Sequence, residues 1–100
     1  MAKVKPVALE RPLAEVAAEI QADYRRQGKP VYFAAVPYVG AMGSMWSMKD
    51  RFGADSAEEV VVRLLGNLGS WRGEVAQRVK AELKGAVNAY RVEQGKKPLY

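Results

Sequence analysis

One stretch of sequence decides the fold of this chain: Ser70-Trp71-Arg72-Gly73-Glu74-Val75-Ala76-Gln77-Arg78-Val79-Lys80-Ala81-Glu82-Leu83-Lys84. Ser70 suits a helix N-cap, because its hydroxyl can accept a hydrogen bond from an orphan N–H group of the first turn. Apolar side chains follow at helical spacing and predict one buried face: Trp71, Val75, Val79, Leu83, Ala86, Val87 and Tyr90. We therefore predict that the longest helix starts at Ser70 and stops at Gly95, with a weak point at Gly85.

Two further helices have clear boundaries in the sequence. Pro12 suits the first position of a helix, apolar residues follow at helical spacing, and Gly28 suits the end. Ser56 and Glu59 have the spacing of a capping box, which predicts the start of another helix. That helix carries an apolar stripe and ends at Gly69, so we expect it to meet the longest helix at a tight corner or a hairpin.

The region between these helices is less regular. Tyr32 and Phe33 follow the first helix in a connector, and we expect both rings to anchor in the core. Pro37 predicts the start of a second helix that runs to about Asp50 or Phe52. Small residues and methionines recur along this helix. We interpret the small residues as tight internal packing or a partly unwound helix, and the methionines as core. The alternatives are close approach by another helix or a partner chain, and a methionine-rich binding surface.

Together these segments predict an all-α fold, a single-domain bundle of about four helices in which the C-terminal helix is the longest. A chain of 100 residues has the size of one domain with one core. Residues 1–11 lack helical periodicity and are predicted to form an N-terminal arm. We expect residues 12–95 to form the helical domain and residues 96–100 to form a basic C-terminal tail.

The residue types argue against several classes of chemistry. The chain has no Cys and no His, so it lacks disulfides, thiolate zinc sites and the commonest general base. Its 11 carboxylates fall mainly on polar helix faces or at caps, where a structural role is favoured. The sequence contains no Gly-rich phosphate loop. We therefore predict that the protein is not an enzyme and has no catalytic residues, metal site or cofactor.

Hydropathy and charge predict the compartment of the protein and the kind of partner that it binds. The sequence contains no run of 18 apolar residues and no apolar core of a signal peptide. We therefore predict a cytoplasmic protein that does not bind a membrane. The formal net charge is +5, and residues 71–100 contribute seven basic and three acidic side chains. This positive end is either a solvated helix face or a surface for an acidic partner or nucleic acid.

The candidate partner-binding residues are basic side chains on predicted polar helix faces: Arg25, Arg26, Arg72, Arg78, Lys80, Lys84 and Arg91. The two helices that meet near Gly69 also fit a helix-turn-helix with a basic second helix. The side chains available for base and phosphate contacts would be Arg72, Gln77, Arg78 and Lys84. Ser70 and Arg78 are polar where such a motif usually buries side chains, which weakens this interpretation. The aromatic residues are predicted at core positions, which argues against a surface for stacking single strands.

Three segments together resemble a known family: Val31-Tyr32-Phe33-Ala34-Ala35-Val36-Pro37-Tyr38, Gly53-Ala54-Asp55-Ser56-Ala57, and Ser70-Trp71-Arg72-Gly73 leading into Arg78-Val79-Lys80-Ala81-Glu82-Leu83-Lys84. The set resembles small proteins carried on plasmids, prophages and integrative elements of proteobacteria, and it spans residues 31–85. Within that genomic class, the chain is similar to anti-CRISPR proteins that inhibit type I systems. Gly40, Gly43 and Gly69 depart from the bulkier pattern of the family, so no interface role is carried over to them.

The resemblance implies a non-enzymatic inhibitor. Its partner would be a host protein or nucleoprotein complex, and in the most specific form a type I CRISPR surveillance complex. The inhibitor would block that complex sterically. The alternative is a small, basic, helical nucleic-acid-binding regulator of a mobile element. A structural or accessory subunit is a further class, which stable homo-oligomers without a host partner would indicate.

Overall fold

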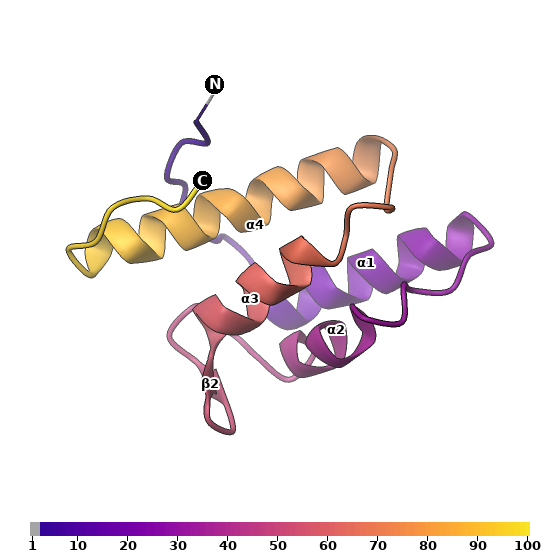
Figure 1. The fold of residues 1–100 in the computed structure, drawn as a ribbon, viewed down its shortest axis with the longest axis horizontal. Coiled ribbons are helices and arrows are strands. Elements are labelled where there is room, and N and C mark those ends of the chain that lie inside the picture. Colours follow the sequence, from indigo (N-terminus) through magenta and orange to yellow (C-terminus); the bar gives the residue numbers. More distant parts are fainter. Residues whose placement is uncertain (1–2) are drawn as a thin grey trace.

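The computed structural model describes residues 3–100 as four helices and one small hairpin (Figure 1). In chain order the elements are α1 (Leu13–Arg26), α2 (Val36–Met42), β1 (Arg51–Phe52), β2 (Asp55–Ser56), α3 (Ala57–Gly66) and α4 (Glu74–Glu93). The two strands pair antiparallel, with Arg51 opposite Ser56 and Phe52 opposite Asp55. Helix α4 is the longest, at 20 residues. The predicted all-α class, with four helices and the longest at the C-terminal end, is confirmed.

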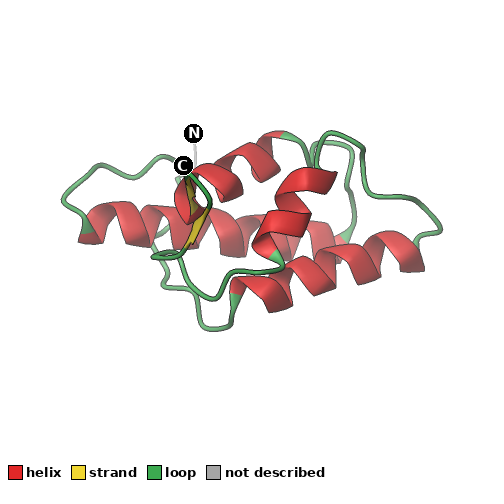
Figure 2. Cartoon of the chain, turned by 90° about the horizontal axis from the view of Figure 1, so that it is seen from below, coloured by secondary structure: helices red, strands yellow, loops and turns green. Residues whose placement is uncertain are grey.

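The helices enclose one core. Helix α1 packs against α2 and α4, and α3 packs against α2 and α4. Figure 1 shows α4 along one side of the molecule, and Figure 2 shows from below that helices make up most of the chain. Each helix contributes large side chains that are almost completely buried: Leu13, Val16, Ile20, Val39, Met42, Val60, Val61, Leu64, Val79, Leu83 and Val87. The apolar stripes seen in the sequence therefore do face inward.

The first and third helices begin as the sequence predicts. Helix α1 follows directly after Pro12, and Gly28 lies just beyond its end with a φ of +70°. At the start of α3, the Ser56 hydroxyl accepts a hydrogen bond from the Glu59 N–H at 3.1 Å. The Glu59 carboxylate in turn accepts one from the Ser56 N–H at 3.0 Å. This complete capping box starts the helix locally, which is why its position could be predicted.

The predicted start of the last helix at Ser70 is wrong, because α4 begins at Glu74. Gly73 precedes it with a φ of +112°, a conformation that other residues rarely adopt. Trp71 is buried in the loop before the helix, where its ring stacks on Tyr24 with 5.7 Å between the ring centroids. The core thus receives this ring from a loop, and residues 67–73 form a longer connection than the tight corner expected.

The predicted second helix is wrong at its C-terminal end, since α2 ends at Met42 and a loop and the hairpin follow. The carbonyl groups of Met45 and Trp46 in this loop accept hydrogen bonds from the N–H groups of Ala14 and Leu13, at 2.9 and 3.0 Å. These bonds satisfy orphan donors in the first turn of α1. The loop therefore caps another helix, and it still buries the Met45 side chain in the core.

The prediction that Tyr32 and Phe33 anchor in the core is also wrong. Tyr32 is 43% exposed and Phe33 is 77% exposed. In the α1–α2 connector the inward positions belong to Val31, which packs against the core, and to Ala35, which is completely buried. The two aromatic rings consequently lie on the surface.

Both ends of the described chain lie along α4, near each other (Figure 1). The buried side chain of Asn88 joins them to the helix. Its Nδ2 donates to the carbonyls of Val4 and Tyr100 at 2.8 and 3.0 Å. Its Oδ1 accepts from the N–H groups of Leu99 and Tyr100 at 2.9 and 3.0 Å. A buried amide with four partners is stabilising, because none of its polar atoms is left unsatisfied.

Gly85 is a contact point for the predicted N-terminal arm. Helix α4 continues through it, and its carbonyl accepts a hydrogen bond from the Val7 N–H at 3.1 Å. A Cβ atom at Gly85 would lie 3.2 Å from the Lys5 carbonyl oxygen, so a larger residue here would push the arm outward by a few tenths of an ångström. The first two residues of the predicted arm lie outside the described residues.

Candidate functional site

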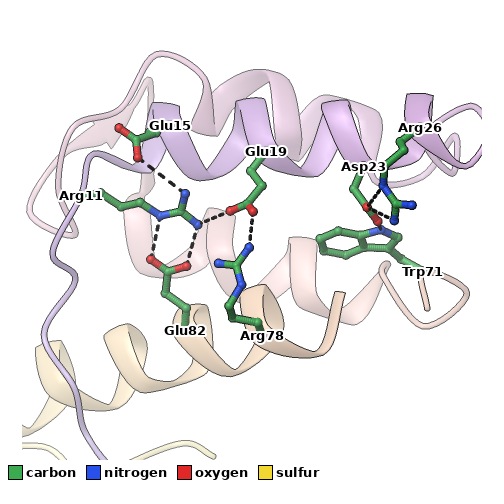
Figure 3. A network of polar contacts seen from close by, with 8 residues as sticks. All are labelled: Arg11, Glu15, Glu19, Asp23, Arg26, Trp71, Arg78 and Glu82. Carbon is green, nitrogen blue, oxygen red and sulfur yellow. Dashed lines mark hydrogen bonds and ion pairs between the residues drawn. The ribbon is translucent and has the colours of Figure 1, made fainter. Parts of the chain in front are cut away.

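One flank of α4 faces α1 across a group of ion pairs (Figure 3). We name this group the α1–α4 ion cluster, and its members are Arg11, Glu15, Glu19, Arg78 and Glu82. Arg11 donates to both carboxylate oxygens of Glu82, with Nε–Oε2 and Nη2–Oε1 distances of 2.9 and 2.7 Å. Its Nη2 also lies 2.6 Å from Glu19 Oε1, and Arg78 donates to the other oxygen of Glu19. Each cation in the cluster therefore has a carboxylate partner.

The cluster favours the charged form of its members. The hydrogen bond to Glu82 raises the pKa of Arg11, although burial opposes part of this rise. The hydrogen bond from Arg78 lowers the pKa of Glu19, and a second hydrogen bond from Arg11 adds to the effect. Charged hydrogen bonds with this two-pronged geometry are among the stronger polar contacts in proteins. The cluster thus ties the segment before α1 to the middle of α4.

The buried carboxylate of Asp23 holds the loop before α4 against α1. Figure 3 shows it with Arg26 and Trp71. Asp23 is 4% exposed and accepts hydrogen bonds from Trp71 Nε1 at 2.8 Å and Gln27 Nε2 at 2.7 Å. Arg26 Nη2 lies 2.6 Å from the other oxygen of Asp23. Burial raises the pKa of Asp23, but the bonds from Arg26, Trp71 and Gln27 outweigh it and hold the pKa below the ordinary value. Arg26 is therefore paired with a carboxylate of its own helix, although its side chain is 68% exposed.

Arg91 is engaged in a similar way near the end of α4. Its Nη1 lies 2.7 Å from Glu58 Oε2 of α3, and its Nε donates to the Lys97 carbonyl at 2.7 Å. The side chains of Arg91 and Glu58 are 22% and 19% exposed. This partly buried pair connects α4 both to α3 and to the C-terminal tail.

The other flank of α4 and the loop before it carry cations in different surroundings. We name Arg72, Lys80 and Lys84 the basic strip. None of the three forms an ion pair with a carboxylate within residues 3–100. Lys80 Nζ donates to the Trp71 carbonyl at 2.7 Å, and Lys84 Nζ lies 5.6 Å from the centroid of the Tyr100 ring. Burial lowers the pKa of Lys80, and the charges of Lys84 and Arg72 lower it further. The three cations are therefore close enough to repel one another.

The structure divides the seven predicted partner-binding residues into three groups. Ion pairs within the chain engage Arg26, Arg78 and Arg91. The basic strip brings together Arg72, Lys80 and Lys84. Arg25 is exposed in the last turn of α1, with no ion pair to another described residue. Partner binding by any of the seven stays a prediction. The structure distinguishes the cations that are paired with a carboxylate from those that are not.

Sequence reasoning missed two features of the surface. Arg11 and Glu82 are 71 positions apart, and nothing in the aperiodic segment around Arg11 pointed to a partner on the last helix. Exposed aromatic rings were missed as well, since Trp46 is 71% exposed and Phe33 is 77% exposed. A signal for Phe33 was present, because Lys29-Pro30 interrupts the helical pattern and loops lie at the surface.

A surface hollow of about 290 Å³ lies where the arm, the loop after α2 and helix α4 meet. Leu9, Met48 and Tyr90 line its apolar part. Lys49 Nζ and Glu93 Oε1 lie 3.9 Å apart at the same hollow. Over residues 3–100, the structure contains no group of three or more side chains placed to hold a metal ion. The hollow offers an apolar contact surface with one ion pair.

In the part of the chain that the structure describes, no helix combines the length and the hydrophobicity needed to cross a bilayer.

Comparisons with known proteins leave the function to be argued from these surfaces. No protein-family model, curated protein or solved structure matches the chain. The resemblance to small proteins of mobile genetic elements therefore stays a prediction that rests on the three sequence segments themselves.

Proposed function

We propose that the protein binds a host nucleoprotein complex and blocks it sterically, without catalysing a reaction. The basic strip carries this proposal, because its three cations have no carboxylate partner among the described residues. A positive surface that is not neutralised from within attracts an anionic partner and speeds the encounter with it. In the most specific form, suggested by the sequence resemblance, the partner is a type I CRISPR surveillance complex in the cytoplasm.

The strip is better suited to such a partner than the opposite flank of α4. To reach a partner, Arg78 would have to give up its hydrogen bond with Glu19. Arg11 would likewise have to leave Glu82 and Glu19. Breaking charged pairs leaves carboxylates unsatisfied, which opposes binding there. Exposed Arg72 can contact an anionic surface at no such cost.

The alternative is a small nucleic-acid-binding regulator of a mobile element, and the same unpaired cations favour it. The helix-turn-helix form of this alternative loses one of its candidates. Arg78 pairs with Glu19 of α1, so it would have to change partners before it could contact a base or phosphate. Gln77 stays exposed on α4 and Arg72 lies in the loop before it, outside the helix. The alternative therefore rests on phosphate contacts by the strip.

Affinity purification from host lysate tests the proposal. The tagged protein is compared with a strip variant, Arg72→Glu with Lys84→Glu, and with a control, Lys96→Glu with Lys97→Glu. Both variants change the net charge equally, and Lys96 and Lys97 are exposed in the tail. We expect the wild type and the control to recover a nucleoprotein complex in fixed stoichiometry, and the strip variant to lose it.

Nuclease treatment separates the two candidate functions. A complex that persists after nuclease supports inhibition by protein contact. Recovery that disappears with nuclease supports the nucleic-acid-binding regulator. Equal recovery by the strip variant and the wild type would contradict a role for the strip. Thermal unfolding of each variant verifies that a loss of binding does not reflect a loss of fold.

A further inference from the structure

Two exposed aromatic rings stand at the connector between α1 and α2. Phe33 is 77% exposed and Tyr32 is 43% exposed, which is unusual for side chains with so much apolar surface. Their ring centroids are 4.9 Å apart and the ring planes are inclined by 59°. The two rings therefore contact each other, and most of the Phe33 surface stays exposed.

Two cations lie close to these rings in the chain. Lys29 precedes Tyr32 by three residues, and Arg25 lies in the last turn of α1. Both side chains are exposed, and neither forms an ion pair with a carboxylate of residues 3–100. Positive charge and exposed aromatic surface therefore occur together at this connector.

Arg72 of the basic strip adjoins the same end of the molecule. Gln27, just after α1, donates from Nε2 to the Arg72 carbonyl at 3.1 Å. Trp71 of the same corner stacks on Tyr24 of α1, with 5.7 Å between the ring centroids. The corner that carries Arg72 thus packs beside the end of α1, directly before the connector that carries the rings.

We propose that this aromatic–basic end, made of Arg25, Lys29, Tyr32, Phe33 and Arg72, binds single-stranded nucleic acid. Bases stack on the free face of Phe33, and the three cations contact phosphates. Surfaces that bind single strands combine these two elements, an aromatic face for stacking and positive charge along the backbone. A duplex keeps its bases stacked on each other, so it would use the cations alone.

This inference goes beyond the proposed function and does not depend on it, because it concerns oligonucleotides without a host complex. The exposure of Phe33 and Tyr32 also removes the ground for the sequence-based argument against a stacking surface, which placed the aromatic residues at core positions. Three of the five residues involved carry positive charge, which favours a polyanion over an apolar protein surface.

Fluorescence anisotropy with labelled oligo-dT and oligo-U of about 12 nucleotides tests the site directly. We expect saturable binding at a salt concentration of about 50 mM that weakens as salt rises. Phe33→Leu keeps an apolar side chain but removes the stacking face, and it should weaken binding about tenfold. Phe33→Trp keeps a stacking face and should bind as well as the wild type.

Charge variants give an independent measurement. Replacing Lys29 and Arg72 by Ala should reduce the slope of log affinity against log salt by about 0.7 for each phosphate that the protein no longer neutralises. Phe52→Ala is the matched control, because Phe52 is also exposed but lies on the hairpin. It should leave the affinity unchanged. Since Phe33 is exposed, its variants should also keep the unfolding temperature of the wild type.

Three results would overturn the proposal. They are the absence of oligonucleotide binding, equal affinity of the wild type and Phe33→Leu, and equal affinity for a duplex of the same sequence. If oligonucleotides do not bind but Phe33→Leu reduces recovery of a host complex, the end is a protein contact instead. Arg72 belongs to both surfaces, so the Phe33 variants, which leave the basic strip unchanged, distinguish failure of this proposal from failure of the proposed function.

Discussion

The flank of α4 that faces α1 and the flank that carries the basic strip contain similar cations in different surroundings. On the first flank, Arg78 pairs with Glu19, and Arg11 approaches Glu82 and Glu19 from the segment before α1. On the second, Lys80 and Lys84 have no carboxylate partner within residues 3–100. Net charge alone does not separate these two groups. The positions of the acidic residues in the fold do.

The difference indicates which cations we expect to stabilise the fold and which we expect to bind a partner. A cation that already has carboxylate partners contributes to the fold and has little left for another molecule. The charge of a cation without such partners is not neutralised within the fold, even where, as in Lys80, the ammonium donates to a backbone carbonyl. Substitutions on the two flanks should therefore separate these effects.

The largest loss of stability is expected at Asp23, on the α1 side. Asp23→Ala removes a buried acceptor and leaves the Trp71 indole N–H without its partner. We expect the free energy of unfolding to fall by about 3 kcal/mol. Urea denaturation measures this change. Glu93→Ala, an exposed carboxylate near the end of α4, is the control and should stay within about 0.5 kcal/mol of the wild type.

Acid pH gives a second measure of the same carboxylate. The pKa of Asp23 is lower in the fold than its ordinary value of 3.8, so the unfolded chain binds the proton more readily. The stability that Asp23 contributes is present above pH 3.8 and is lost as the pH falls through the lower pKa of the folded state. Asp23→Ala should flatten the stability profile in that range. A variant profile with the same acid slope as the wild type would contradict this role.

A smaller loss is expected within the α1–α4 ion cluster. Arg11→Ala removes the hydrogen bonds to Glu82 and Glu19, and we expect a loss of about 2 kcal/mol in urea denaturation. Arg11→Lys should recover only part of it, because one ammonium group cannot reproduce the paired contacts of guanidinium. Full recovery by lysine would show that charge matters here and paired geometry does not.

The smallest effect on stability is expected in the basic strip. Lys84→Ala removes a cation near the Tyr100 ring and also relieves repulsion on Lys80, so the two consequences oppose each other. The free energy of unfolding should change by less than about 0.5 kcal/mol. A loss as large as that of Arg11→Ala would place the strip among the residues that hold the fold. It would then weaken the contrast between the two flanks.

Local signals in the sequence determined much of the secondary structure. The capping box of Ser56 and Glu59 starts α3, and Pro12 and Gly28 bracket α1, because each depends on contacts or dihedral angles within a few residues. The apolar stripe from Val79 to Val87 correctly predicted that the middle of α4 contributes to the core. These interactions form between near neighbours, so the order of residues is enough to predict them.

Only the tertiary structure decided where α2 ends, where α4 begins and which charges are neutralised. Trp71 continues the apolar pattern of α4, yet it reaches the core from a loop, since Asp23 and Tyr24 of another helix receive it. The pairing of Arg11 with Glu82 likewise joins residues that are far apart in the chain. Burial and ion pairing depend on which surfaces meet in space, and a periodic pattern shows that a face is apolar without showing what covers it.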